Sequence, residues 1–269
     1  MARMRTPSGP LPNRPPDPPD RAPLPTDTRD LPELPPAFGA TLDAGLLALG
    51  LRLEPSQRQA IETHVRLLVA WNAHINLTAI REPAALAREH VLDSLAATSL
   101  LAAPRARSLA DIGSGGGFPG LPLAIASPEM RATLIESTRK KAGFLDVAVT
   151  AAGLADRVRV VAARAEGVPA GAAGWIPADL VTARAVASLA DLARLAAPLL
   201  APGGALIAWK RGDVEREIAD ARQALAANGF GRPEIHPVRV PDLADHRLVV
   251  VPVERPLRRA EKSRGTLRR

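Results

Sequence analysis

The stretch SLADIGSGGGFPGLPLAIA, residues 108–126, decides the fold class. It opens with an apolar run that ends at Ile112, places four glycines between positions 113 and 117, and turns apolar again after Pro119. Glycine reaches positive φ at low cost and lets the backbone approach a ligand with no Cβ in the way. The pattern predicts a strand, a tight turn that lines a ligand site, and a helix that begins near Pro119.

The chain beyond this turn alternates short apolar segments with helical segments. Strands are predicted at 108–113, 132–136, 158–163, 179–184, 204–209, 234–240 and 246–253. The alternation predicts a parallel, doubly wound sheet, and the last two strands, joined by a loop alone, predict a terminal antiparallel hairpin. We therefore expect an α/β, Rossmann-like fold with a seven-stranded, mostly parallel sheet. This arrangement is typical of class I S-adenosylmethionine-dependent methyltransferases, whereas a dinucleotide-binding dehydrogenase more often continues with parallel units or a second domain.

Composition divides the chain into four parts. Twelve of the 27 prolines lie in residues 1–36, where too few apolar residues remain to pack, so this part is predicted to be a disordered tail. Residues 37–104 are predicted to form an N-terminal helical cap and residues 105–254 the methyltransferase domain. Residues 255–269 are predicted to be a disordered basic tail, since seven basic residues and one acid give it +6 of the net charge of +7. Such a tail either contacts nucleic acid or is a solvated end.

Two helices are predicted in the cap. The first covers 56–72, with Ser56 and Gln59 as a capping-box pair at its start. The second covers 83–101, with Pro83 in the first turn, where proline is tolerated.

Composition also excludes several kinds of site. The chain has no cysteine, which excludes disulfides, thiolate–metal sites and cysteine nucleophiles. Its five histidines lack metal-ligand spacing, so no metal is expected. No apolar run approaches the length that spans a membrane and the N-terminus lacks a signal-peptide pattern, so we expect a soluble, cytoplasmic protein with no membrane partner.

Charged residues stand at the predicted carboxyl ends of the strands, where open α/β sheets bind their ligands. Glu136 ends the second strand, 23 residues after Gly113, and can accept hydrogen bonds from ribose hydroxyls. Arg184 and Lys210 end the fourth and fifth strands, and Glu166 lies in the loop after the third. Arg184 has a second interpretation as a sheet-capping ion pair, and Lys210 as a solvated side chain. The glycine turn and the acid alone suit NAD as well as S-adenosylmethionine.

Two further polar groups keep two interpretations each. Arg139, Lys140 and Lys141 open a predicted helix, where the helix dipole disfavours cations, so they either meet phosphates or lie fully exposed. His90 and Asp93 are three residues apart on one helix face, which favours a helix-stabilising polar pair and leaves a functional role as the second interpretation.

Five segments together resemble one family, the glucose-inhibited division protein B family. They are NLTAI (76–80), HVLDSL (90–95), DIGSGGGFPGLPLAI (111–125), RKKAGFLDVAVTAAGL (139–154) and ARAVASL (183–189). The Phe-Pro-Gly that follows the glycines is far more specific than a generic glycine turn. The resemblance runs from about residue 46 to 253 and leaves out both tails. The stretch 167–180 is a few residues longer than usual, which leaves the shape of that loop open.

The resemblance implies a function and site residues. Members of this family are bacterial 16S ribosomal RNA guanine-N7 methyltransferases that act in the 530 loop of the small ribosomal subunit, with S-adenosylmethionine as cofactor. Gly113 and Phe118 match the family's cofactor loop, Ala165 and Glu166 the pair near the adenine, and Arg184 an arginine at the site. The cofactor-binding residues expected from motif and resemblance together are Gly113, Gly115, Phe118, Glu136, Ala165, Glu166 and Arg184.

The missing residue types narrow the chemistry further. Without cysteine the covalent route to 5-methylcytosine is closed, and without tyrosine the Asn-Pro-Pro-Tyr motif of exocyclic amino methylation is absent. Guanine N7 carries an in-plane lone pair and needs no base, so catalysis would rest on placing it in line with the methyl group. Arg184 and Lys210 are the expected positioning residues. The sequence shows no motif for proton transfer, which is consistent with methylation at N7 but does not single it out.

Two alternatives remain open. One is an S-adenosylmethionine-dependent methyltransferase that acts on another RNA site or on a small molecule, since four Phe, three Trp and no Tyr provide no evident base-stacking platform. The other is a ribosome-associated binding protein without activity, although a pure binder does not need a cofactor cleft. The sequence leaves the oligomeric state open and is compatible with a monomer.

Overall fold

The protein is described by a computed structural model that covers residues 23–102, 106–168 and 176–254. Within these residues seven strands form one sheet in the order β3-β2-β1-β4-β5-β7-β6. The strands are β1 (Ser108–Ile112), β2 (Arg131–Ile135), β3 (Val158–Val161), β4 (Ala178–Arg184), β5 (Leu200–Arg211), β6 (Glu234–Pro237) and β7 (His246–Pro252). Strands β1 to β5 are parallel, and β7 is antiparallel to both β5 and β6. The α/β fold class expected from the sequence, with its terminal antiparallel hairpin, is confirmed.

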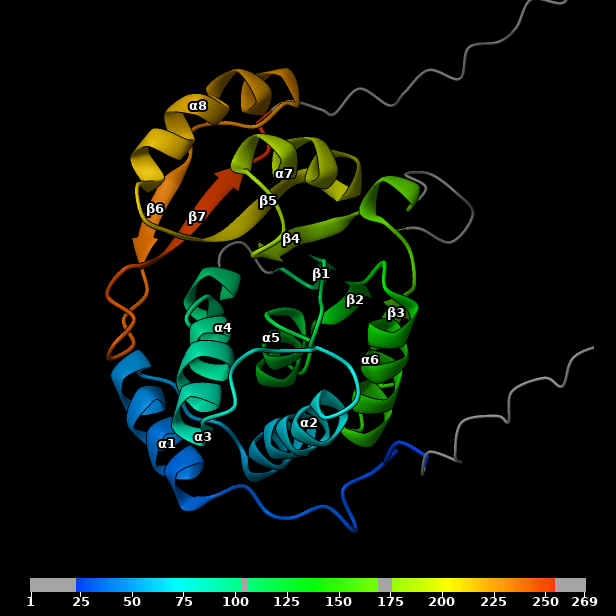
Figure 1. The fold of residues 1–269 in the computed structure, drawn as a ribbon. Helices are drawn as coiled ribbons and strands as arrows, with labels where there is room; N and C mark the ends of the chain where they lie inside the picture. The colour runs from blue at the N-terminus through cyan, green and yellow to red at the C-terminus, as the bar shows by residue number, and fades with distance from the viewer. Residues whose placement is uncertain (1–22, 103–105, 169–175, 255–269) are drawn as a thin grey trace, which may run out of the picture.

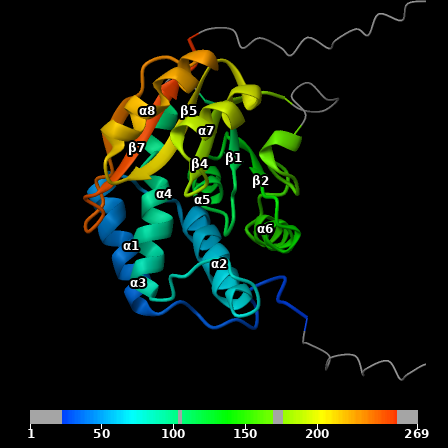
Figure 2. The ribbon, with the colours of Figure 1, turned by 45° about the horizontal axis from the view of Figure 1, so that its top comes forward.

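Helices cover both faces of the sheet. On one face lie α2 (Pro55–Asn72), α5 (Gly120–Ala126) and α6 (Arg139–Ala151), and on the other lie α7 (Leu189–Ala196) and α8 (Val214–Ala227) (Figure 1). Figure 2 shows the same division after a rotation, with α7 and α8 together above the strands. The central strands are buried on both faces, as in β4, where Leu180 joins one buried apolar cluster and Val181 the other. Such strands read as continuous apolar runs, which is why the sequence pattern identified them.

The N-terminal helices share a core with the sheet. They are α1 (Pro36–Leu49), α2, a continuous helix made of α3 (Pro83–Ala85), the π-helix η1 (Leu86–Leu92) and α4 (Asp93–Leu95), and the 3₁₀ turn η2 (Thr98–Ala102). Phe38 and Leu68 from these helices belong to the same buried cluster as Leu134 and Phe144 from β2 and α6. The predicted helical cap is therefore packed directly onto the sheet's helical layer. Among the described residues no helix is long and apolar enough to span a membrane.

The start of α2 differs from the prediction. The helix begins at Pro55, and the backbone N–H of Glu54 donates to the side-chain oxygen of Gln57 at 2.8 Å. The predicted capping pair of Ser56 and Gln59 is wrong by two positions, because Pro55 takes the first helical position and moves the cap to Glu54.

A proline-rich segment, residues 23–35, lies along α2 and is called the strap below. The Arg66 guanidinium of α2 donates to the carbonyl of Pro32 at 3.0 Å, and the Trp71 indole N–H donates to the carbonyl of Pro25 at 2.8 Å. In Figure 1 the strap is the dark blue segment that passes beneath α2 before α1 begins. Proline has no backbone N–H, so this proline-rich segment cannot form a regular backbone hydrogen-bond ladder. Side chains of α2 donate hydrogen bonds to its carbonyls instead.

The strap corrects the prediction of a disordered tail over 1–36. That prediction is wrong for residues 23–36, because partners far along the chain order a segment that has no core of its own. Residues 1–22 and the predicted basic tail, 255–269, lie outside the described residues.

Candidate functional site

The glycine turn joins β1 to α5 at the carboxyl edge of the sheet. Gly113 has φ +68° and donates its N–H to the carbonyl of Ile135 at 2.8 Å. A Cβ on Gly113 would lie 2.7 Å from Cγ2 of Val186, which belongs to the loop between β4 and α7. Only glycine therefore allows both the left-handed backbone and the close approach of this loop. Helix α5 begins at Gly120, as the sequence predicts.

A cavity of about 700 Å³ opens beside this turn. It lies between the turn, the end of β2, the loop after β3 and the start of α7, and its walls include Ile112, Gly113, Ile135, Ala165, Glu166 and Val186. Of the predicted cofactor-binding residues, Gly113, Ala165 and Glu166 line this cavity, Ala165 buried and Glu166 exposed. Its apolar walls and polar rim suit a flat, partly apolar ligand with a few hydrogen-bonding groups.

Glu136 is held by the same turn. Its buried carboxylate accepts one hydrogen bond from the Gly115 N–H at 3.0 Å and one from the Thr138 N–H at 2.7 Å. Ile135 and Ser137, its neighbours in the chain, both line the cavity. The structure thus brings Gly115 and Glu136 together at the cavity's edge, and each carboxylate oxygen keeps acceptor capacity beyond its amide bond.

Asp111, which the sequence analysis did not single out, connects the turn to β4, the neighbouring strand in the sheet. Its carboxylate is fully buried and accepts from the Thr182 hydroxyl at 2.7 Å and from the Gly120 N–H at 3.3 Å. Burial raises the pKa of Asp111 to about 6. The bonds tie β1, β4 and the start of α5 into one rigid unit below the turn.

Arg184, at the end of β4, points to the cap side of the sheet. Its guanidinium donates to the Glu89 carbonyl at 2.8 Å, to the Asp93 carboxylate at 2.9 Å and to Nδ1 of His90 at 3.0 Å. The side chain keeps 15% exposure, so one edge of this charge still faces outward. Arg184 forms the ion pair of its second interpretation, and its predicted role at the cofactor or the reacting groups stays a prediction.

His90 has its hydrogen bonds fixed on both ring nitrogens. Nδ1 accepts from Arg184, so Nε2 carries the proton and donates to the hydroxyl of Thr78 at 2.7 Å. Burial, and next the Arg184 charge, lower the pKa of His90 to about 3. Thr78 is brought there by Asn72, whose side-chain oxygen accepts from the Thr78 N–H at 3.0 Å. His90 is therefore a neutral, fixed ring.

Phe118 lies on this side of the turn and not in the cavity. It is 6% exposed, stacks on His90 with ring centroids 4.6 Å apart, and lies 4.7 Å from the ring of His64. The guanidinium carbon of Arg184 is 5.4 Å from the Phe118 ring centroid, within cation–π range. Phe118 thus connects the glycine turn to the cap, and its predicted contact with a cofactor stays a prediction.

Lys210 is not among the residues that line the cavity. Its ammonium donates to the Ala187 carbonyl at 2.8 Å and pairs with Glu217 at 2.7 Å, and Glu217 accepts from the Leu189 N–H at 2.7 Å. Lys210 and Glu217 thereby hold the loop between β4 and α7 in place. The predicted positioning role of Lys210 stays a prediction, and its described contacts are with this loop and with Glu217 of α8.

The sequence reading missed how His90, Asp93 and His246 belong together. His90 and Asp93 were expected to form a pair within one helix, whereas both bond to Arg184 instead. His246, 153 positions further on, donates from Nδ1 to Asp93 at 2.8 Å. No local spacing signals a pairing across this distance. Among the described residues no group of three or more His, Cys, Asp or Glu could hold a metal ion.

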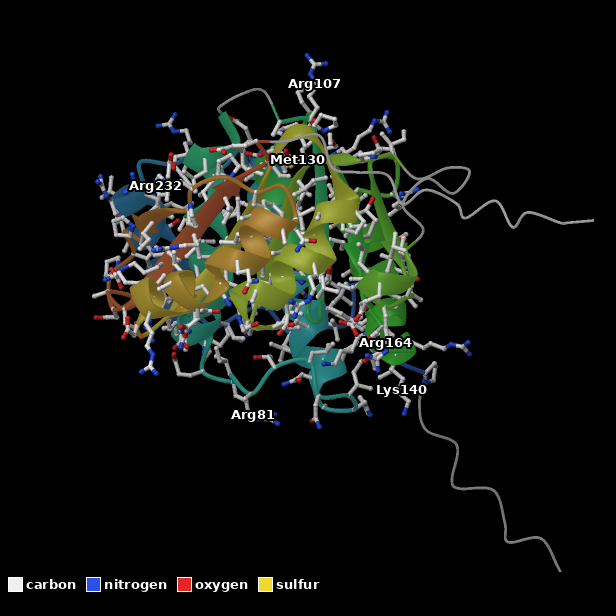
Figure 3. All side chains as sticks on the ribbon, turned by 90° about the horizontal axis from the view of Figure 1, so that it is seen from above. Arg81, Arg107, Met130, Lys140, Arg164 and Arg232 are labelled. Carbon is white, nitrogen blue, oxygen red and sulfur yellow. The ribbon has the colours of Figure 1, made fainter. Side chains whose placement is uncertain are left out.

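Three exposed basic side chains lie at one end of the molecule. Figure 3 shows Arg81, Lys140 and Arg164 at one end, and Arg107, which precedes β1, at the opposite end. Arg164 follows β3 and Lys140 lies in the first turn of α6 after β2, so both belong to the carboxyl edge. Arg81, Lys140 and Arg164 are exposed, and Arg164 also lines the cavity.

Comparisons with known proteins give the following matches. The family model described as rRNA small subunit methyltransferase G matches residues 57–243. A protein of Roseiflexus sp. (strain RS-1) named ribosomal RNA small subunit methyltransferase G is 44% identical over 205 residues, 76% of this chain and 86% of that protein. A protein of the same name from Stenotrophomonas maltophilia (strain R551-3) is 42% identical over 217 residues, 81% of this chain and 95% of that protein. The structure of an O-methyltransferase from Bacillus cereus in complex with SAH is 16% identical, covers 80% of this chain and 99% of its own, and has a TM-score of 0.51, a likeness of fold.

Proposed function

Because the chain belongs to the rRNA small subunit methyltransferase G family, the glucose-inhibited division protein B family that its sequence resembles, we propose that it methylates N7 of a guanine in the 530 loop of 16S ribosomal RNA. The methyl donor is S-adenosylmethionine. The observation that carries the proposal is the pairing of a glycine-turn cavity with a fixed, partly exposed arginine, Arg184, at one edge of the sheet. The substrate implies a cytoplasmic protein that meets the small ribosomal subunit.

The cavity residues fit S-adenosylmethionine. The Gly113 position, where a Cβ would meet Val186, is the kind of close backbone cradle that an amino-acid or ribose moiety requires. Glu136 would accept from the ribose hydroxyls, and Ala165 and Glu166 would flank the adenine. When bound, the cofactor supplies an electrophilic methyl group on sulfonium sulfur.

The contribution of this chain to the reaction is to orient the guanine base and the methyl group. Guanine N7 attacks with an in-plane lone pair and requires no deprotonation, so the protein has to hold the base and methyl group in line. His90 supports this reading, because Arg184 and Thr78 occupy both of its nitrogens and it has no free lone pair to act as a base. The exposed edge of Arg184 would contact the base or its phosphate, with the cap behind it.

Exposed Arg81, Lys140 and Arg164 support an RNA substrate over a small molecule. Their positive charge at the carboxyl edge would meet phosphates, which position an RNA without reading its sequence (Figure 3). A small-molecule enzyme needs no such rim, so this charge distribution favours the ribosomal substrate.

The test uses small ribosomal subunits that lack the modification, with methyl-labelled S-adenosylmethionine. We expect label in 16S RNA and, after borohydride reduction and aniline treatment, strand cleavage at one guanosine in the 530 loop. Label without aniline-sensitive RNA would refute N7 as the acceptor and leave methylation at another atom. Label that enters metabolites of a cell extract, and not RNA, would favour the small-molecule alternative.

Two variants connect the product to the site. Arg184→Ala should strongly reduce cleavage in a folded protein, because the arginine that orients the reactants is gone. Glu136→Ala should weaken S-adenosylmethionine binding by about 1–3 kcal/mol, since ribose hydroxyls lose their acceptor. Unchanged calorimetric affinity in Glu136→Ala would rule out Glu136 as the ribose acid.

A further inference from the structure

The π-helix η1 offers Arg184 an acceptor that an ordinary helix would consume. In an α-helix the Asp93 N–H would bond to the Glu89 carbonyl, four residues back. Here it bonds to the carbonyl of Arg88, five residues back, and Glu89 accepts from Arg184 instead. Single π turns of this kind often occur at functional sites. One wide turn thus presents Glu89, His90 and Asp93 to a single guanidinium.

Asp93 is the charged member of this set and is itself held by side chains from three strands, β4, β5 and β7. One carboxylate oxygen accepts from Arg184 at 2.9 Å and the other from Nδ1 of His246, in β7, at 2.8 Å. Its backbone carbonyl accepts from the Trp209 indole N–H, in β5, at 2.8 Å. Asp93 and His246 are 1% and 4% exposed, so water does not compete for these bonds.

We propose that Asp93, locked by His246, is a positioning residue for methyl transfer that acts by fixing the Arg184 guanidinium. The inference rests on the proposed function, because it assigns these residues to the same site. An arginine on a flexible stem samples many rotamers, and bonds at two of its nitrogens to three acceptors leave one arrangement. The exposed edge of Arg184 is then fixed in place before substrate arrives.

The described partners of Asp93 (Arg184, Trp209 and His246) all lie outside the cavity lining, so the effect of Asp93 should separate from cofactor binding. Asp93→Asn removes the charge partner and keeps the shape of the side chain. We expect kcat to fall about 10–100-fold, the cost of a misplaced reactive geometry. The dissociation constant for S-adenosylmethionine, measured by calorimetry, should change less than about threefold, which is under 0.7 kcal/mol.

A double-mutant cycle distinguishes positioning from mere support of the fold. If Asp93 acts through Arg184, Asp93→Asn should lower kcat little in an Arg184→Gln background, because the group it positions is absent. The matched control is Asp179→Asn at the opposite end of β4, where Asp179 accepts from the Arg107 N–H at 2.8 Å and the Ser108 N–H at 3.0 Å. This control should lower the melting temperature and leave kcat unchanged.

His246 gives a second, milder test if Asp93→Asn does not fold. His246→Ala should lower kcat, and His246→Asn, whose amide nitrogen can stand near the position of Nδ1, should restore most of it. Equal losses of kcat from Asp93→Asn in both Arg184 backgrounds, or wild-type kcat in folded Asp93→Asn or His246→Ala, would overturn the inference. Wild-type protein that transfers no methyl group to small subunits would overturn the proposed function, and this inference with it.

Discussion

Replacement of Gly113 by alanine tests whether the glycine turn builds the cofactor cavity. Gly113 has φ +68°, so an alanine there takes on left-handed strain of about 1–2 kcal/mol. Its Cβ would also lie 2.7 Å from Cγ2 of Val186, a side chain that lines the cavity and is 39% exposed. Because Val186 can move, we expect the excess cost to appear as a change in the cavity and not as unfolding.

Gly203→Ala is the matched control. Gly203 has φ +78°, so it carries the same backbone strain, and a Cβ there would meet nothing within 4 Å. Both variants should therefore lose about 1–2 kcal/mol of unfolding free energy in urea titrations. Only Gly113→Ala should weaken S-adenosylmethionine binding in calorimetry, by about tenfold or 1.4 kcal/mol.

A third variant separates the side-chain clash from the backbone strain. Gly113→Ala combined with Val186→Ala removes the carbon that the new Cβ would strike, and should recover part of the affinity. If Gly113→Ala binds the cofactor as tightly as Gly203→Ala does, the assignment of this turn to the cofactor is refuted.

Two further perturbations have defined outcomes. Deletion of residues 1–22 should leave the melting temperature unchanged, whereas deletion of residues 1–35 should lower the unfolding free energy by about 1–3 kcal/mol, because the strap supplies acceptors to α2; equal stability of the two truncations would count against a structural strap. Burial lowers the pKa of His64 to about 4 and of His90 to about 3, while that of Asp111 is raised to about 6. Lowering the pH from 7 to 5 therefore protonates His64 and His90 in the unfolded state and Asp111 in the native state. Together these groups should lower the free energy of unfolding by a net of about 2 kcal/mol. His64→Leu should reduce that loss to about 0.5 kcal/mol in urea titrations at the two pH values, and an undiminished loss would contradict a neutral, buried His64.

The fold could be predicted from sequence because its signals are local. The apolar runs of β1 and β4 are bounded by polar or glycine residues, and Gly113 marks the turn that follows β1. The cavity-lining Gly113, Ala165 and Glu166 follow strand ends, so the topology of the sheet alone brings them together.

The contacts on the cap side of the site could not be predicted from the sequence, because they depend on tertiary structure. The pairing of His246 with Asp93 joins residues 153 positions apart, and the π turn leaves the Glu89 carbonyl to accept from Arg184. The strap escaped prediction for a similar reason, because its order comes from Arg66 and Trp71 and not from its own composition. In each case the deciding partner lies outside any sequence window.

The position of β7 in the sheet has a consequence for biosynthesis. This strand is the last along the described chain but lies between β5 and β6, and it carries the His246 that locks Asp93. A ribosome that adds about 5–20 residues per second needs roughly 8–30 seconds to travel the 153 positions from Asp93 to His246. In the last part of that time, once Arg184 has been added, the nascent chain contains the glycine turn and Arg184 but not the completed network. If Asp93 positions Arg184 as proposed, chains that end before β7 should therefore lack full methyl-transfer activity.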